Sequence, residues 1–260
     1  MPRHLYVTGQ AYTSGRGHDG DVLTLSTVRA GPPCRGVHGR AVEARYRGTN
    51  LRSGRVRVLI VVAALKGGNC KTCLSVILSE SGAARWESAL IVDADLQASA
   101  SRWHELAAGA MRAEVLGAPT VDLARRLAGA GADRYPLVVV DCPPAHVEIV
   151  RVGLALADAC LIPCRPAIAD VDRLWPTAAL AAEASVPVLA VLTMTRGRTM
   201  APMAAREALR AGRVRVAKTT LPQREAFARN FGQLVTGELL DVGSRLLSEL
   251  VRIVEKGPRR

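Results

Sequence analysis

The stretch from residue 58 to residue 73, VLIVVAALKGGNCKTC, constrains the fold of this 260-residue chain more than any other. Residues 58–64 form an unbroken apolar run rich in β-branched side chains, which is typical of a strand buried on both faces of a parallel sheet. The run leads into the glycine turn KGGNCKT of residues 66–72, and a helix-compatible sequence follows over Leu74–Trp86. Strand, glycine turn, Lys-Thr and helix are the parts of a phosphate-binding loop, so the sequence predicts such a loop here.

Each part of this loop has a physical role in binding phosphate. The glycines let the backbone approach closely enough for its N–H groups to bind phosphate oxygens, and the helix N-terminus adds positive potential. Lys71 would reach the β- and γ-phosphates, and the Thr72 hydroxyl would bind Mg²⁺. The residues expected to bind the nucleotide are Gly67, Gly68, Asn69, Cys70, Lys71, Thr72 and Cys73.

Carboxylates follow two further apolar segments. Ala89–Val92 is followed by DADLQ at residues 93–97, and Leu137–Val140 is followed by Asp141 and then by CPPA at residues 142–145. Because ligands of open α/β sheets bind at the carboxyl ends of the strands, these carboxylates are expected close to the loop. Asp141 would hold Mg²⁺ through water, and residues 142–145 would form a switch that senses the γ-phosphate.

The loop departs from the standard pattern, because Leu65 and Cys70 stand where glycines are usual and Lys66 precedes the glycine pair. The order KGGxxKT, DxDxQ and an apolar strand ending in D-x-P-P resembles the ParA/MinD family of ATPases, which carry a deviant Walker A loop. Among these it is most similar to the short plasmid-partition ParA proteins, and the resemblance covers about residues 56–256. It implies ATP and Mg²⁺ as cofactors and a doubly wound α/β fold, with a mostly parallel sheet and helices on both faces.

The resemblance also implies roles for single residues. Lys66 would reach across an ATP-bound dimer to the nucleotide of the partner subunit, and Asp95 would orient the attacking water. Pro222, within TTLPQREAF at residues 219–227, would lie next to the nucleotide base. The implied catalytic residues are Lys66, Lys71 and Asp95, and the implied metal-binding residues are Thr72, Asp93 and Asp141. Cys70, Leu96 and Ala145 depart from the family pattern, which leaves open a degenerate copy that binds nucleotide without hydrolysing it.

The chain is strongly basic, with 35 Lys and Arg against 23 Asp and Glu, and its net charge of +12 favours a polyanionic partner. Residues 196–229 hold nine basic residues against two acidic ones, which fits contact with a phosphate backbone rather than with base edges. ParA proteins bind DNA non-specifically through this part of the chain when ATP joins them as dimers. The candidate DNA-binding residues are Arg196, Arg198, Arg213, Arg215 and Lys218. The alternative is an ordinary solvated basic surface.

Residues 1–55 differ in composition from the rest of the chain. They hold nine arginines, three acidic residues and nine glycines, without a sustained apolar periodicity. Such a segment buries too little surface to offset its ordering entropy, so we expect a disordered basic extension, followed by an ATPase domain over residues 56–260. The extension is either a DNA-binding arm or the result of a start codon assigned upstream of the true one, and the second is preferred.

Two other features bear on partners and location. The expected C-terminal helix, Ser244–Lys256, carries leucines and valines on one face, while its polar face mixes arginine and glutamate. This pattern favours a helix that packs on the core over a membrane anchor. Cys70 and Cys73 have the spacing of a metal site, but a phosphate loop and a metal site require incompatible geometries, so reduced thiols are expected. The expected location is the cytoplasm, in association with the nucleoid.

The function that the resemblance implies is ATP-dependent segregation of DNA. The protein would dimerise on ATP, bind DNA non-specifically, and hydrolyse ATP slowly when a small centromere-binding partner similar to ParB stimulates it. Three alternatives stay open at this point. They are an ATPase that positions a protein cargo over the nucleoid, a MinD-like membrane ATPase, and the degenerate copy described above.

Overall fold

The computed structural model describes residues 4–7, 10–13, 25–27, 58–196, 200–224 and 229–256. The first three of these ranges are short strands, which pair in an antiparallel sheet in the order β1-β2-β3. Their bounds are β1 (His4–Val7), β2 (Gln10–Thr13) and β3 (Leu25–Thr27). The rest of residues 1–57 lies outside the described residues, so the disorder expected for residues 1–55 stays a prediction there.

The larger body of the protein is built on one parallel sheet. Its strands follow the order β10-β9-β8-β4-β7-β5-β6, and β11 also pairs with β9. Every pairing that is described in this sheet is parallel. The strands are β4 (Val58–Val62), β5 (Leu90–Asp93), β6 (Glu114–Gly117), β7 (Leu137–Asp141), β8 (Ala159–Cys164), β9 (Val188–Thr195), β10 (Arg215–Val216) and β11 (Leu221–Pro222).

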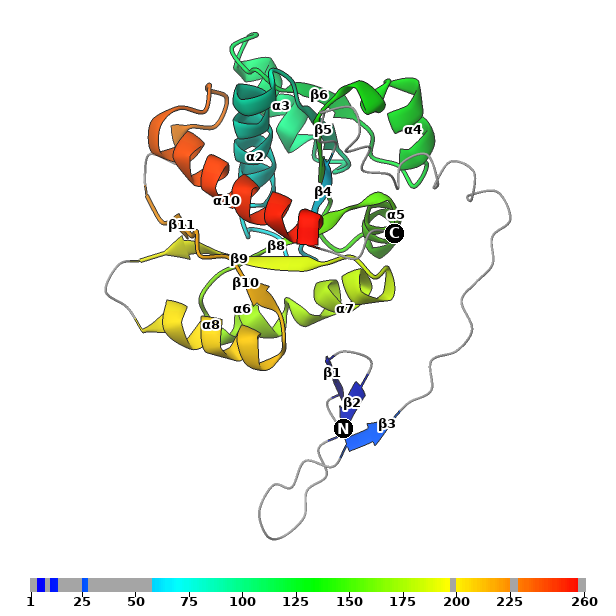
Figure 1. Ribbon diagram of the computed structural model, residues 1–260, viewed down its shortest axis with the longest axis vertical. Coiled ribbons are helices and arrows are strands. Elements are labelled where there is room, and N and C mark those ends of the chain that lie inside the picture. The colour runs from blue at the N-terminus through cyan, green and yellow to red at the C-terminus, as the bar shows by residue number, and fades with distance from the viewer. Residues whose placement is uncertain are drawn as a thin grey trace.

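Helices cover both faces of this sheet (Figure 1). One face packs against α2 (Lys71–Trp86), α3 (Ser99–Leu106) and α10 (Gly237–Lys256). The other face packs against α4 (Leu123–Gly129), α5 (Val147–Leu156), α7 (Trp175–Glu183) and α8 (Ala201–Ala211). The described residues also include the shorter α6 (Ile168–Asp172) and the 3₁₀ turn Ala132–Arg134. The expected α/β fold, with a parallel sheet between two helical layers, is confirmed.

The apolar runs form buried strands because alternate side chains enter two different cores. In β4, Val58 and Ile60 belong to the core under α2 and α10, whereas Leu59 and Val61 belong to the core on the opposite face. All five residues of β4 are buried, as are all five of β7. A strand covered on both faces therefore reads as a continuous apolar run, which is why these strands could be recognised in the sequence.

The C-terminal helix packs against the body of the protein, as its pattern predicted. It begins at Gly237, seven residues before the expected start at Ser244, and its leucines lie buried against α2. At Gly243 the two helices approach so closely that an added Cβ would lie 2.7 Å from the backbone oxygen of Ile77. The structure therefore covers the apolar face of α10 with protein. Within the part of the chain described here, no helix is both long and apolar enough to cross a membrane.

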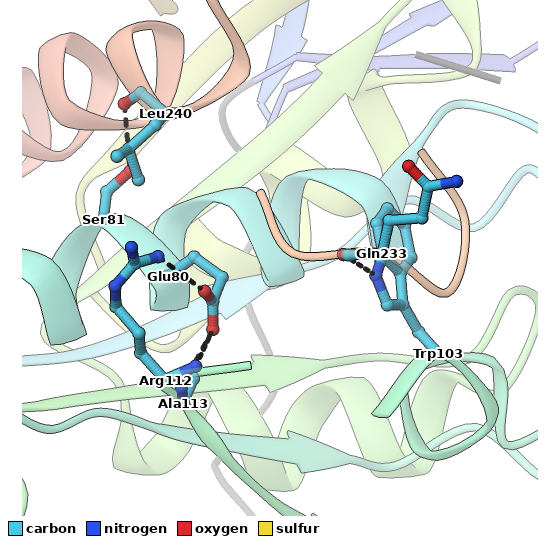
Figure 2. A network of polar contacts seen from close by, with 7 residues as sticks. All are labelled: Glu80, Ser81, Trp103, Arg112, Ala113, Gln233 and Leu240. Atoms are coloured by element: carbon cyan, nitrogen blue, oxygen red, sulfur yellow. Dashed lines mark hydrogen bonds and ion pairs between the residues drawn. The ribbon is translucent and has the colours of Figure 1, made fainter. Parts of the chain in front are cut away.

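A polar network joins α2 to its neighbours (Figure 2). The fully buried carboxylate of Glu80 accepts the backbone N–H groups of Arg112 and Ala113, both at 2.9 Å, and an ion pair from the Arg112 guanidinium. Ser81 donates its hydroxyl to the Leu240 carbonyl at 3.2 Å. In α3, Trp103 donates its ring N–H to the Gln233 carbonyl at 2.9 Å. These contacts fix the helical layer that carries the start of α2.

One predicted element differs from the structure. The stretch from Ala167 to Ala184 reads as a single helix, but it forms α6 and α7 with a break at Arg173 and Leu174. The reason is Pro176, which has no N–H to donate and whose ring would clash with the carbonyl four residues earlier in a continuous helix. The proline is accommodated in the first turn of α7, where that N–H would be free anyway.

Candidate nucleotide-binding site

The three sequence motifs meet at the carboxyl edge of the sheet. Asp141, the last residue of β7, is the register partner of Val62 on one side and of Asp93 on the other. The phosphate loop follows β4 directly, in the middle of the sheet. Since β4 lies between β7 and β8, later strands are added on both of its sides, and such a switch point is where open α/β sheets bind ligands.

The loop adopts a conformation with two residues in the left-handed region. Gly68 has φ of +74° and Cys70 has φ of +65°, and Cys70 is the residue that precedes the first turn of α2. Position 70 therefore keeps the backbone geometry that a glycine would take most easily, although it carries a side chain. Gly67 and Gly68 are exposed, and Asn69 is buried with a side-chain oxygen that has no partner among the described residues.

Lys71 lies at the start of α2 with its ammonium close to the loop. Its Nζ donates to the carbonyl oxygen of Lys66 at 3.2 Å, and the residue is only 7% exposed. Desolvation by burial lowers the pKa of Lys71, while the charges of Asp141 and Asp95 raise it. The lysine is thus held beside two carboxylates, and its one hydrogen bond within the described residues is to a backbone carbonyl, from which it can move to a phosphate oxygen.

Asp141 has the features of a magnesium-binding carboxylate. Its Oδ1 accepts the hydroxyl of Ser75 at 3.1 Å, and its Oδ2 is buried with no partner in the described part of the chain. Burial raises the pKa of Asp141 to about 7, while a hydrogen bond from the Thr72 side chain lowers it. A buried carboxylate oxygen without a partner requires a proton, a water or a cation, so these residues fit Mg²⁺ held by Thr72 and by Asp141.

Asp93 and Asp95 lie at the end of the next strand. Ser101 donates both its backbone N–H and its hydroxyl to Oδ2 of Asp93, each at 2.8 Å. The backbone N–H of Asp95 donates to Oδ1 of Asp93 at 3.3 Å. Asp93 therefore holds the segment that follows β5 to the first turn of α3. Its expected place in the magnesium shell stays a prediction. Asp95 is half-buried and accepts the Gln97 N–H at 3.0 Å, which leaves its carboxylate at the edge of the site.

Lys66, the lysine expected to act across a dimer, forms an ion pair within its own chain. Its Nζ bonds to Oδ1 of Asp170 in α6, and the Lys66 side chain is 30% exposed whereas that of Asp170 is 8% exposed. The contact joins the phosphate loop to α6 and leaves the Lys66 side chain partly exposed. Any contact between Lys66 and a second subunit therefore requires this ion pair to break.

The segment after Asp141 packs on the phosphate loop. Ala145 has φ of +60°, again the region that glycine favours, and its N–H donates to the Leu65 carbonyl at 3.2 Å. The amide that a switch would offer to the γ-phosphate is thus present and bonded to the loop. Leu96, the other departure from the family pattern, is 66% exposed.

Pro222 lies at the same edge of the sheet as the phosphate loop. In β11 it is the register partner of Thr195, at the carboxyl end of β9, and the next residue, Gln223, donates its N–H to the Thr195 carbonyl. Arg196 donates from Nε to the Gln223 side chain at 2.9 Å. This arrangement is compatible with a base-contacting role for Pro222, which stays a prediction.

The candidate DNA-binding residues lie near both ends of strand β9. Arg215 pairs in register with Leu189 near the start of β9, whereas Arg196 follows the end of that strand. Arg213, Arg215 and Lys218 are exposed and lie along the connection into and out of β10. Leu189 and Thr195 are six positions apart along β9, so these basic residues extend over about 20 Å. Arg198 lies outside the described residues.

Four residues of this site escaped the sequence reasoning: Ser75, Ser101, Arg165 and Asp170. Ser75 could have been found, because it lies four residues after Lys71 and so on the same face of α2. Arg165 could have been suspected, because it follows the end of β8, the strand beside β4. Asp170 left no signal, since only the fold brings α6 to the loop.

The cysteines take no part in a metal site in the described structure. Cys70, Cys73, Cys142, Cys160 and Cys164 are free thiols, and Cys34 lies outside the described residues. In the residues described, no three His, Cys, Asp or Glu side chains are grouped so as to hold a metal ion. A magnesium ion that arrives with nucleotide needs fewer protein ligands, because phosphate and water oxygens fill most of its six positions.

Comparisons with known proteins agree with the fold. No protein-family model matches the chain. A curated relative, the "Maintenance of carboxysome distribution protein A" of Gloeobacter kilaueensis, is 38% identical over 120 residues, which are 45% of this chain and 54% of the relative. The chain thus spans about half the length of the curated relative that it matches.

Solved structures match over more of the chain. A candidate plasmid partition protein from Borrelia burgdorferi B31, bound to AMPPNP, has a TM-score of 0.61 at 15% identity, covering 75% of this chain and 98% of its own. A variant of McdA from Cyanothece in complex with ATP has a TM-score of 0.59 at 15% identity, covering 79% of this chain and 99% of its own. The cell division ATPase MinD of Pyrococcus furiosus has a TM-score of 0.59 at 20% identity, covering 76% of this chain and 99% of its own. The chain therefore has the fold of the ParA/MinD-type ATPases that its motifs resemble.

Proposed function

We propose that this protein is a ParA/MinD-type ATPase that binds ATP with Mg²⁺ and dimerises when it does so. One observation carries the proposal: a phosphate loop, the buried Lys71 and the unpartnered Oδ2 of Asp141 lie together at the switch point of a parallel sheet. Burial lowers the pKa of Lys71, and the negative charges of Asp141 and Asp95 act in the opposite direction. A buried cation and a buried, unpartnered carboxylate oxygen side by side suit a ligand that brings both phosphate and a metal.

The residues of the site divide the work of phosphoryl transfer among them. When bound, the magnesium nucleotide supplies the γ-phosphoryl group and the cation that neutralises its developing charge. The loop N–H groups hold the phosphates, and Lys71 exchanges the Lys66 carbonyl for phosphate oxygens. The Thr72 hydroxyl would bind the metal, Asp141 would hold it through water, and Asp95 would orient the attacking water by accepting a hydrogen bond from it.

The departures from the family pattern do not exclude hydrolysis. Cys70 and Ala145 adopt φ values of +65° and +60°, so each keeps the backbone conformation that a glycine would give. The cost of a non-glycine residue in this region is about 1 kcal/mol or more for each position, which a folded domain can offset. Both residues retain an N–H, the only group that the loop or the switch needs from them. These conformations favour a working site over a degenerate copy.

Lys66 links the nucleotide to the dimer. In the single chain its ammonium pairs with Asp170, so the monomer holds this lysine in a satisfied position. A second ATP-bound copy would offer phosphate oxygens in place of one carboxylate, and the exchange would favour the dimer only when the γ-phosphate is present. Hydrolysis would return Lys66 to Asp170 and release the dimer.

For the cargo, the comparisons favour an alternative over the function first implied by the sequence. The curated relative is named for the distribution of carboxysomes, so we propose that this chain positions a cargo of protein over the nucleoid. Segregation of DNA is the second candidate, favoured by the likeness in fold to a plasmid partition protein. Both functions would use non-specific DNA binding and a partner that stimulates slow hydrolysis, similar to ParB in the second.

The basic edge of the sheet is the proposed DNA surface. Arg213, Arg215 and Lys218 are exposed around β10, and the charge of a dimer would double the number of phosphate contacts. Because affinity for DNA depends steeply on the number of phosphates neutralised, dimerisation would convert weak binding into strong binding. Membrane binding is not proposed, since α10 buries its apolar face against α2.

DNA co-sedimentation tests this proposal. The full-length protein is mixed with duplex DNA of random sequence and with ATP, ADP or no nucleotide, all with Mg²⁺. We expect strong binding only with ATP, its loss in Lys66→Ala, and a weakening of at least tenfold in the double variant Arg213→Ala/Arg215→Ala. The matched control is Arg125→Ala, an exposed arginine of α4, a helix that lies away from β10 (Figure 1). Binding that is equal with and without nucleotide would contradict the proposal.

A further inference from the structure

Arg165 lies on the phosphate loop, and none of the motifs assigns it a role. It follows the last residue of β8, the strand beside β4, and its Nη2 donates to the Gly68 carbonyl at 2.9 Å. An added Cβ at Gly68 would lie 3.8 Å from this nitrogen. The guanidinium is therefore in direct contact with the glycine pair, about a hundred residues away in sequence.

The position of Arg165 is not explained by its own hydrogen bonding. Its Nε is buried and has no partner among the residues that the structure describes. A buried donor without a partner costs about 1–3 kcal/mol, so a side chain placed for stability alone would be expected to satisfy this group. Such an unsatisfied group in a native structure calls for a functional reason.

Peptide geometry supplies a reason. The carbonyl of Gly68 and the N–H of Asn69 belong to one planar trans peptide and therefore point in opposite directions. When Arg165 binds the carbonyl, it fixes the plane of this peptide and directs the Asn69 N–H away from itself. Phosphate loops bind their anion through backbone N–H groups, so the orientation of this peptide decides whether the loop can bind.

This loop needs such support more than a glycine-rich loop does. Cys70, two residues after Gly68, is held at φ of +65°, where a side chain is strained. If that strain relaxed, the neighbouring peptide planes would rotate, and their N–H groups would no longer point toward a common anion site. The positive charge of Arg165 also reaches this residue: it lowers the pKa of the Cys70 thiol, against the larger effect of burial, which raises it.

We propose that Arg165 is a positioning residue of the phosphate loop, which holds the Gly68–Asn69 peptide in its anion-binding orientation and compensates for the cysteine at position 70. The inference rests on the proposed nucleotide binding. It makes a specific claim about coupling, because Arg165 matters most while position 70 carries a side chain. With a glycine at position 70, the loop reaches the same conformation without strain, and the arginine becomes less necessary.

A double-mutant cycle tests this coupling. The variants are Arg165→Gln, Cys70→Gly and the two combined, and the measurement is the Kd of a fluorescent ATP analogue with Mg²⁺ in the full-length protein. We expect Arg165→Gln to raise the Kd about tenfold, the equivalent of one positioned hydrogen bond. In the Cys70→Gly background the same substitution should raise it less than threefold. Arg165→Lys should recover part of the loss, because an ammonium can still donate to a carbonyl.

Each outcome decides the proposal. The control is Arg173→Gln, an exposed arginine at the end of α6, which should leave the Kd unchanged. Equal effects of Arg165→Gln in the two backgrounds would overturn the compensation, and a wild-type Kd in Arg165→Gln would overturn the positioning role. In both cases the wild-type protein would still bind, so the proposed function would survive. Failure of the wild-type protein to bind the analogue would overturn both.

Discussion

At Cys70 the loop keeps a left-handed backbone without the residue that adopts it most easily. The φ of +65° strains any side chain at this position, while glycine takes such angles freely. Cys70→Gly should therefore raise the free energy of unfolding by about 0.5–1 kcal/mol. This is a net gain, because glycine also increases the conformational entropy of the unfolded chain, which offsets part of the strain that is relieved. Urea denaturation measures the change.

Cys70→Ala provides the control for that prediction, because alanine removes the thiol and keeps the Cβ. It should leave the free energy of unfolding within about 0.5 kcal/mol of the wild type. An equal gain from alanine and from glycine would attribute the effect to the thiol and would refute the explanation from φ.

Asp141 makes the nucleotide-free protein sensitive to pH. Burial raises its pKa in the folded state to about 7, from the usual 3.8 of an exposed aspartate. Between these values the folded state binds more protons than the unfolded state, so the free energy of unfolding falls as the pH rises from about 4 to about 7, and the loss is complete above that range. In magnesium-free protein, urea denaturation at pH 5 and pH 8 should therefore show lower stability at pH 8.

Asp141→Asn should remove this part of the pH dependence. An amide cannot ionise, and its oxygen can still accept the hydroxyl of Ser75, so the variant should lose less stability than the wild type between pH 5 and pH 8. It should also lose the stabilisation that Mg²⁺ with ATP gives the wild type. If the wild type and the variant respond equally to pH, Asp141 is not the buried carboxyl that titrates.

Single residues of the site were predictable where the motif is local and unpredictable where the partner is distant. The loop residues 66–72 are contiguous, and Asp141 ends an obvious apolar strand, so sequence spacing found them. Lys66 and Asp170 are 104 residues apart, and no periodicity connects them. The φ of Cys70 also could not be predicted from the residue type, because cysteine, unlike glycine, has no preference for the left-handed conformation.

Among the elements, the contact between α10 and α2 depends on the absence of one side chain. At Gly243 an added Cβ would lie 2.2 Å from the Ser81 hydroxyl and 2.7 Å from the Ile77 backbone oxygen, closer than packed atoms allow. Gly243→Ala should therefore lower the free energy of unfolding by about 1–3 kcal/mol through overpacking, in spite of the better helix propensity of alanine. Thermal or urea unfolding measures the loss.

A glycine in an open position gives the matched control for the helix contact. Gly129 ends α4, and an added Cβ there would meet no atom within 4 Å. Gly129→Ala should be neutral or stabilise the protein by up to about 1 kcal/mol. If both substitutions stabilise the protein, the close approach of α10 to α2 is wrong.

The elements were predictable in proportion to their burial. The strands β4, β7 and β8 are buried over their whole length, so they appear as apolar runs that are easy to recognise. By contrast, the edge strand β6 has exposed ends and begins with Glu114, and the sequence reasoning passed over it. An edge strand is fixed by pairing with its neighbour, in this case β5, and pairing leaves little trace in composition.

For the whole molecule, the sheet separates two activities that the proposed function must couple. The candidate nucleotide site lies at the carboxyl ends of β4, β5 and β7, whereas Arg213 and Arg215 lie beside β10, next to the start of β9. The proposed dimerisation would couple the two, because a second copy bound at the candidate nucleotide site would bring a second set of basic residues with it.

The mass of the protein in solution, measured by size-exclusion chromatography with light scattering, tests the central claim most directly. With ATP and Mg²⁺ the wild type should double from its monomer mass of 27.6 kDa, and with ADP it should stay a monomer. Lys66→Ala should stay a monomer with ATP, while Lys256→Ala, at the end of α10, should dimerise as the wild type does. A wild type that stays monomeric with ATP, or a Lys66→Ala variant that dimerises normally, would contradict the account.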